Sequence, residues 1–124
     1  MSDMKYLGID YGRRKIGLAV SDGKLAEPFR VIRYKDIKSL VQQIKQIINI
    51  EKVDKVVVGI SENEMAKESK EFAKTLGAQI YDETLTTHDA IKLSILGGVK
   101  MKKRREMEDA YAATIMLQNY LDRQ

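Results

Sequence analysis

The amino-terminal third of the chain alternates apolar residues with polar or small ones, which is the pattern of short β-strands. Three strands are expected, at residues 5–10, 15–21 and 28–34. In the third strand this alternation places Phe29, Val31 and Arg33 on one face. Turn-forming residues separate the segments, among them Gly12 and Gly23, so the three strands are predicted to pair as successive antiparallel hairpins.

The spacing of apolar residues changes to a helical period after Asp36, which is a good N-cap residue. The elements expected from there on are a helix over 37–48, a strand at 55–60, a helix from Ser61 to Leu76, a strand at 79–83, a helix from Thr86 or Thr87 to Gly97, and a last helix from near Arg104. Strands that alternate with helices form parallel pairs through right-handed crossovers. The order βββ-α-β-α-β-α-α therefore predicts an α/β fold, a single domain over residues 1–124 with a mixed five-stranded sheet flanked by helices.

The composition excludes several kinds of site. The chain has 124 residues, no cysteine and one histidine. It therefore has no disulfides, no Cys-ligated zinc or iron–sulfur site, and no multi-His metal site within one chain. No apolar run approaches the ~20 residues of a membrane span, and the first residues lack the apolar stretch of a signal peptide. We expect a cytoplasmic protein with no membrane partner.

Acidic residues stand out at three places along the chain. Asp10 ends the first expected strand, and Asp82 and Glu83 end a later one. Asp109 shares a helix face with alanines, where an unsatisfied carboxylate is costly. Taken singly, the three also fit a turn residue, a helix cap and a residue favoured by a helix dipole. Together they are expected to converge on one crevice.

Two basic clusters lie close in sequence to these acids. They are Arg13, Arg14 and Lys15, and Lys100 with Lys102, Lys103, Arg104 and Arg105. With a net charge of +4, the clusters alone also fit solvated surface runs. Three converging carboxylates repel one another, however, and a hard cation such as Mg²⁺ or Mn²⁺ relieves that repulsion. Acids that hold such ions beside cations that hold a polyanion are typical of phosphodiester hydrolysis.

Three motifs in a fixed order carry a resemblance to a known family. They are Gly8–Ala19 (GIDYGRRKIGLA), Asp82–Thr87 (DETLTT) and Asp109–Ala113 (DAYAA). Together they resemble the opening, central and closing motifs of the YqgF/RuvX family. The resemblance implies an RNase H-like fold related to RuvC resolvases, with Asp10, Glu83 and Asp109 as catalytic acids that bind Mg²⁺ or Mn²⁺.

Members of that family are described as nucleases that mature the 5′ end of pre-16S rRNA and as Holliday junction resolvases. The resemblance thus implies a nucleic-acid partner, either RNA or four-way DNA. Thr84 stands where the family has Arg, and Ser61 where it has Pro. The phosphate-binding cation is then expected to be Arg13, Arg14 or Lys15, and a non-catalytic RNA-binding module of ribosome assembly is an alternative.

The opening motif also resembles that of another class. ATP-binding proteins of the actin and sugar-kinase type begin with G-x-D-x-G, but they need two such subdomains around the nucleotide, and 124 residues supply one. Symmetric cleavage of a junction calls for two copies of the site. We expect a monomer or a weak homodimer.

Overall fold

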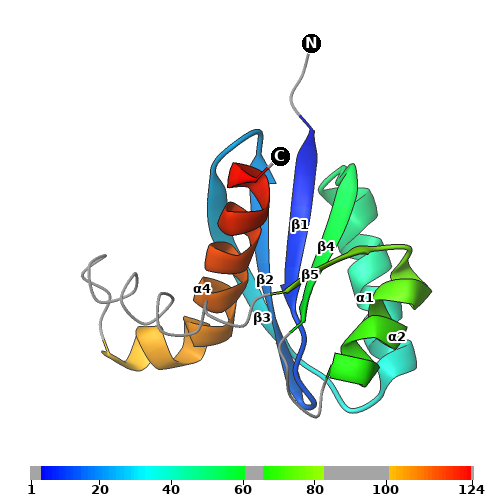
Figure 1. The fold of residues 1–124 in the computed structure, drawn as a ribbon. Coiled ribbons are helices and arrows are strands. Elements are labelled where there is room, and N and C mark those ends of the chain that lie inside the picture. The colour runs from blue at the N-terminus through cyan, green and yellow to red at the C-terminus, as the bar shows by residue number, and fades with distance from the viewer. Residues whose placement is uncertain (1–3, 61–65, 83–100, 124) are drawn as a thin grey trace.

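The computed structural model describes residues 4–60, 66–82 and 101–123 (Figure 1). Its elements are β1 (Lys5–Asp10), β2 (Lys15–Asp22), β3 (Ala26–Arg33), α1 (Ile37–Ile50), β4 (Lys55–Ile60), α2 (Ala66–Leu76), β5 (Gln79–Asp82) and α4 (Met101–Asp122). None of the helices in this part of the chain is long and apolar enough to cross a membrane. The expected helix from Thr86 or Thr87 to Gly97 and the expected helix start at Ser61 lie outside the described residues.

The five strands form one mixed sheet, as the sequence predicts, and their order is β3-β2-β1-β4-β5. β1 pairs with β2 and β2 with β3 in antiparallel fashion, whereas β1 pairs with β4 and β4 with β5 in parallel. The helices α1 and α2 cover one face of this sheet and α4 covers the other (Figure 1). The α/β architecture of the prediction is thereby confirmed.

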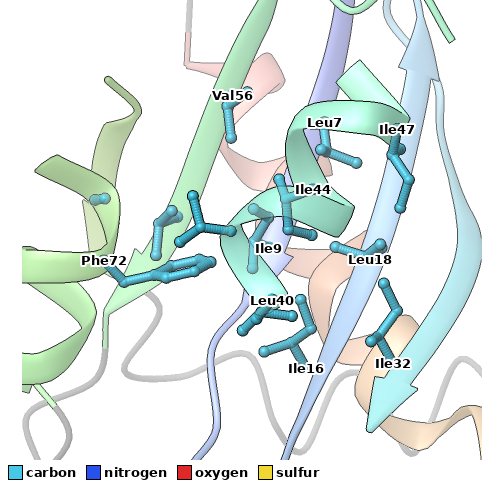
Figure 2. Close-up of a cluster of buried hydrophobic side chains, with 13 residues drawn as sticks. Leu7, Ile9, Ile16, Leu18, Ile32, Leu40, Ile44, Ile47, Val56 and Phe72 are labelled. Carbon is cyan, nitrogen blue, oxygen red and sulfur yellow. The ribbon is translucent and has the colours of Figure 1, made fainter. Parts of the chain in front are cut away.

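The core under α1 and α2 is built from large aliphatic side chains. They come from β1, β2, β3 and β4 and from α1 and α2, and Figure 2 shows them pointing toward one another. They include Leu7, Ile9, Ile16, Leu18, Leu40, Ile44, Val58 and Phe72. Strand residues two positions apart and helix residues four positions apart supply this cluster, because those spacings bring side chains to one face. Burial of each such Leu or Ile side chain contributes about 1.5–3 kcal/mol to folding.

The amino end of α1 is capped as the sequence predicts. The Asp36 carboxylate accepts a hydrogen bond from the backbone N–H of Ser39 at 2.8 Å. Hydrogen bonds to Ser39 hold the pKa of the Asp36 carboxyl below its ordinary value, because they favour the charged form. The start of α1 is therefore fixed by a local bond as well as by the apolar stripe behind it.

Under α4 a second cluster, which includes Val57, Met116 and Leu117, lies beside small residues at the points where the helix comes closest to β1 and β2. A Cβ on Gly8 would lie 2.9 Å from Leu117 Cβ, and a Cβ on Gly17 would lie 1.8 Å from the Asp109 carbonyl oxygen. Ala19 is also fully buried here. Because these residues are small, α4 packs closely against the sheet. This close packing sets the distance between Asp109 and β2.

The expectation that Phe29 and Val31 share a face is wrong. The β2–β3 register shifts at a bulge, where Leu18 pairs with Arg30 but the next residue, Ala19, pairs with Pro28. Phe29 is the extra residue, and it packs against the α1-side core. Val31 pairs with Gly17, which faces α4. The strand also begins at Ala26, ahead of the expected start, and Pro28 is tolerated within it because β3 is an edge strand.

Candidate active site

Asp10 is the last residue of β1, the central strand. It lies at the end of the sheet where the parallel strands β1, β4 and β5 have their carboxyl ends. Gly8 contacts α4 and its neighbours Leu7 and Ile9 belong to the opposite core, so the alternation of the strand places Asp10 on the α4 face. Across the sheet Asp10 pairs with Gly17 on one side and with Gly59 on the other. Both partners lack side chains, so no neighbouring strand residue covers the carboxylate at this level.

Asp109 comes to the same place from α4. Its carbonyl oxygen occupies the space that a Cβ on Gly17 would need, and Gly17 is the direct strand partner of Asp10. Paired strands lie about 4.8 Å apart, so the Asp109 segment sits roughly one strand from Asp10. The structure thus brings together the segments that carry two of the three predicted acids, which are far apart in sequence.

Lys15 forms an ion pair with Asp109. Its Nζ lies 3.1 Å from Asp109 Oδ2, and the two side chains are 41% and 29% exposed. Partly exposed pairs of this kind contribute at most about 1 kcal/mol to stability, since water screens them. Lys15, which the sequence predicts to bind nucleic acid, also places a positive charge beside one of the predicted acids.

The third predicted acid, Glu83, lies outside the described residues. The chain reaches it from β5, whose last pairs set Tyr81 opposite Gly59 and Asp82 opposite Ile60. Gly59 is in turn the partner of Asp10. Within 4–60, 66–82 and 101–123 no three His, Cys, Asp or Glu side chains form a metal-binding cluster. The described backbone carries Asp10 and Asp109 at the site and ends one residue before Glu83.

The basic clusters lie on different elements. Arg13 and Arg14 are exposed in the turn between β1 and β2, three and four positions after Asp10. Four cations of the second cluster, Lys102, Lys103, Arg104 and Arg105, lie in the first turns of α4, which begins at Met101, whereas Lys100 lies outside the described residues. The expectation that this helix starts near Arg104 is thus too late by about one turn; the side chains of the four cations lie outside the described part.

One residue near the site escaped the sequence analysis. The hydroxyl of Tyr34 donates a hydrogen bond to the Gly12 carbonyl, and the Tyr34 N–H donates to the Arg14 carbonyl at 3.0 Å. Burial, with a hydrogen bond to Tyr11, raises the pKa of Tyr34 well above its usual value, so the hydroxyl stays a donor at neutral pH. Tyr34 ties the turn that carries the arginines to the end of β3. The sequence signal for this contact is an aromatic residue, Tyr34, at the end of the third expected strand, together with a turn that contains a glycine, Gly12.

A family model described as RuvX, Holliday junction resolvase, matches residues 4–123. A protein of Carboxydothermus hydrogenoformans is 37% identical over 96% of this chain and 96% of its own length. A protein of Shouchella clausii is 38% identical over 98% of this chain and 96% of its own length. The names of both propose them as pre-16S rRNA nucleases.

Solved structures share the fold at low identity. RuvC of T. thermophilus in complex with a Holliday junction substrate gives a TM-score of 0.60 at 17% identity, covering 97% of this chain and 96% of that one. The Fowlpox virus resolvase with Holliday junction DNA gives 0.63 at 10% identity, covering 97% and 98%. The sheet and helices described above are therefore those of the RNase H-like resolvase fold.

Proposed function

Since this chain belongs to the RuvX family of Holliday junction resolvases, we propose that it is a metal-dependent nuclease whose site is the sheet edge where Asp10 and Asp109 meet. The observation that carries the proposal is the β1–β2 register. It pairs Asp10 with Gly17. The backbone of Asp109 in α4 packs directly against that glycine. Asp10 and the α4 segment that carries Asp109 thus lie near one another at the carboxyl ends of the parallel strands, where α/β proteins hold their ligands.

The donor set at this edge fits a hard divalent cation. Asp10 and Asp109 offer oxygen ligands, which Mg²⁺ and Mn²⁺ prefer, and the motif match adds Glu83 as a third. The Lys15 ammonium, 3.1 Å from Asp109 Oδ2, supports this fit because it marks a place where a cation reaches the carboxylate. When bound, such ions activate water and neutralise the leaving oxygen of a phosphodiester.

The remaining residues at the edge bind and position the substrate in this proposal. Asp10 is held by a paired strand and Asp109 by a packed helix, so both carboxylates are presented from rigid elements. Arg13 and Arg14, in the exposed turn beside Asp10, bind substrate phosphates. They replace the arginine that the family has at position 84, where this chain has Thr84.

The proposed substrate is the 5′ extension of pre-16S rRNA, which places the protein in ribosome biogenesis in the cytoplasm. The names of the relatives at 37% and 38% identity, which match this chain over nearly its whole length, favour that substrate. One site per chain suffices for a single cut in RNA, so a monomer or weak homodimer can perform it.

A second candidate function is resolution of four-way DNA junctions. The description of the matching family model favours it. Two symmetric cuts need two copies of the site, so this function requires a homodimer whose two sites face opposite strands. Oligomeric state on a junction therefore separates the two candidates.

The experiment compares cleavage of a 5′-extended pre-16S RNA and of a four-way DNA junction by purified protein in Mg²⁺, in Mn²⁺ and in EDTA. We expect the RNA to be cut only with metal. Asp10→Asn should reduce the rate at least about 1,000-fold, since several kcal/mol of transition-state stabilisation is lost. Glu108→Gln is the matched control, because Glu108 is exposed on α4 beside Asp109. Binding without cleavage in every condition would instead identify a non-catalytic RNA-binding module.

A further inference from the structure

A basic groove with a volume of about 830 Å³ lies beside the turn that follows β1. Its walls come from the turn between β1 and β2, from the end of β3 and from the amino end of α1. Four cations line it: Arg13, Arg14, Arg33 and Lys35. None of the motifs matched in the sequence includes Arg33 or Lys35, which are both exposed.

The groove adjoins the acidic site. Arg33, in its wall, is the strand partner of Lys15, and Lys15 contacts Asp109. Arg13 and Arg14, in another wall, follow Asp10 within four residues. A strand of nucleic acid with one phosphate at the acids therefore has its neighbouring phosphates within reach of these cations, since phosphates along a strand lie about 6–7 Å apart (compare the 3.4 Å rise per base).

The remaining lining also suits a sugar–phosphate backbone. The one carboxylate, Asp36, is engaged with the Ser39 N–H and lies at the positive end of the α1 dipole, which offsets its charge. Ser39 and Gln43 lie one helical turn apart and offer uncharged hydrogen-bonding groups. Among the described residues that line the groove none is a large aliphatic one, which argues against an apolar ligand.

We propose that this groove binds the substrate's sugar–phosphate backbone outside the scissile phosphate, with Arg33 and Lys35 as its far contacts. The nucleic acid then runs from the acids over the turn at 11–14 and onto the amino end of α1. Tyr34, which bonds both Gly12 and Arg14, keeps the turn in the position that this path needs. The choice of nucleic acid as ligand rests on the proposed function, whereas the path rests on the groove.

The test is binding measured by fluorescence anisotropy against salt in EDTA, so that no cleavage occurs. The probes are labelled single-stranded RNA, duplex RNA and a four-way DNA junction. The variant is Arg33→Gln with Lys35→Gln. Its control is Lys24→Gln with Lys45→Gln, which removes the same charge from exposed positions outside the groove. We expect the slope of log affinity against log salt to fall by roughly 1.4–1.8 in the groove variant, because each phosphate contact contributes about 0.7–0.9.

Equal slopes for the groove variant, its control and the wild type on every probe overturn the proposal. The probe on which the groove variant loses slope identifies the nucleic acid that the groove accepts. Cleavage assays on the same proteins separate this proposal from the nuclease proposal. A wild type that binds through the groove but never cleaves contradicts only the nuclease, and a wild type that cleaves with no effect of the groove variant on binding contradicts only the groove.

Discussion

The two faces of the sheet are built on different principles. Under α1 and α2, large side chains such as Ile9 and Ile44 fill the space between sheet and helices. Under α4, Gly8 and Gly17 have no side chains; the side chains of Leu117 and Met116 fill the space beside Gly8, and the backbone of Asp109 fills the space beside Gly17. On the first face, burial of large apolar side chains stabilises the fold. On the second face, the glycines bury less side-chain area, but they let α4 pack close to Asp10. The comparison teaches that the α1 face serves packing alone, whereas the α4 face combines a second buried cluster with the close approach that the proposed site needs.

The largest effect is expected at Gly17. Its Cβ position falls 1.8 Å from a backbone oxygen of α4, and backbone cannot move aside as a side-chain tip can. Gly17→Ala should therefore displace α4 and destabilise the protein by about 4–5 kcal/mol, which is the upper range for one substitution. Urea unfolding measures the loss. Gly8→Ala is the control, since its Cβ would meet only side-chain atoms of Leu117 and Met116; a larger loss for Gly8→Ala would contradict the comparison.

A large but purely structural effect is expected at Ile44, which is fully buried under α1. Ile44→Ala should destabilise the protein by about 3 kcal/mol, because it removes buried methyl groups and leaves a cavity. Cleavage per folded molecule should stay at the wild-type rate when measured below the melting transition. A fall in that rate with the protein still folded would show that the α1 face takes part in the site.

A smaller effect is expected at Lys15, whose ammonium offsets the charge of Asp109. In EDTA, Lys15→Gln should lower stability by at most about 1 kcal/mol, because the neighbouring carboxylates then repel each other without a counter-charge. Millimolar Mg²⁺ should close that gap, since an ion bound by the native state restores positive charge there. Thermal melts with and without metal measure both. Lys24→Gln, at an exposed position, should respond to neither condition.

The smallest effect concerns the α1 cap and pH. The folded-state pKa of Asp36 is lowered, so its contribution to stability is present above its ordinary pKa of 3.8 and disappears as pH falls through the folded value. Asn at this position also caps a helix but does not titrate there. The stability difference between wild type and Asp36→Asn should therefore shrink between pH 5 and pH 2. A difference independent of pH in urea titrations would mean that the charge of Asp36 plays no part.

The elements that sequence reasoning located well are those whose signal is local. Strand 55–60 is a β-branched run and α1 has a capping aspartate before a regular apolar stripe, and both were confirmed. The bulge at Phe29 could not be read from the chain, because it depends on how β3 meets β2. The start of α4 was placed too late, since the four cations at 102–105 carry no apolar period.

In the candidate site, too, local features could be predicted from the sequence and long-range contacts could not. The place of Asp10 at a strand end followed from local pattern, and the structure confirms it. The meeting of Asp109 with Gly17 could not be predicted, because nothing in the sequence marks which glycine a distant helix will cover. The ion pair of Lys15 with Asp109 and the Tyr34 bond to Gly12 depend on the same long-range packing. Glu83 stays a prediction.

The contact between Gly17 and Asp109 has a consequence for synthesis of the protein. Asp10 is synthesised well before Asp109, and the two segments come together only when α4 docks on the finished sheet. Chains emerge at about 5–20 residues per second, so for several seconds each growing chain carries Asp10 without its partner. If the proposed site needs both acids, the growing chain cannot cleave nucleic acid before α4 has been synthesised and has docked.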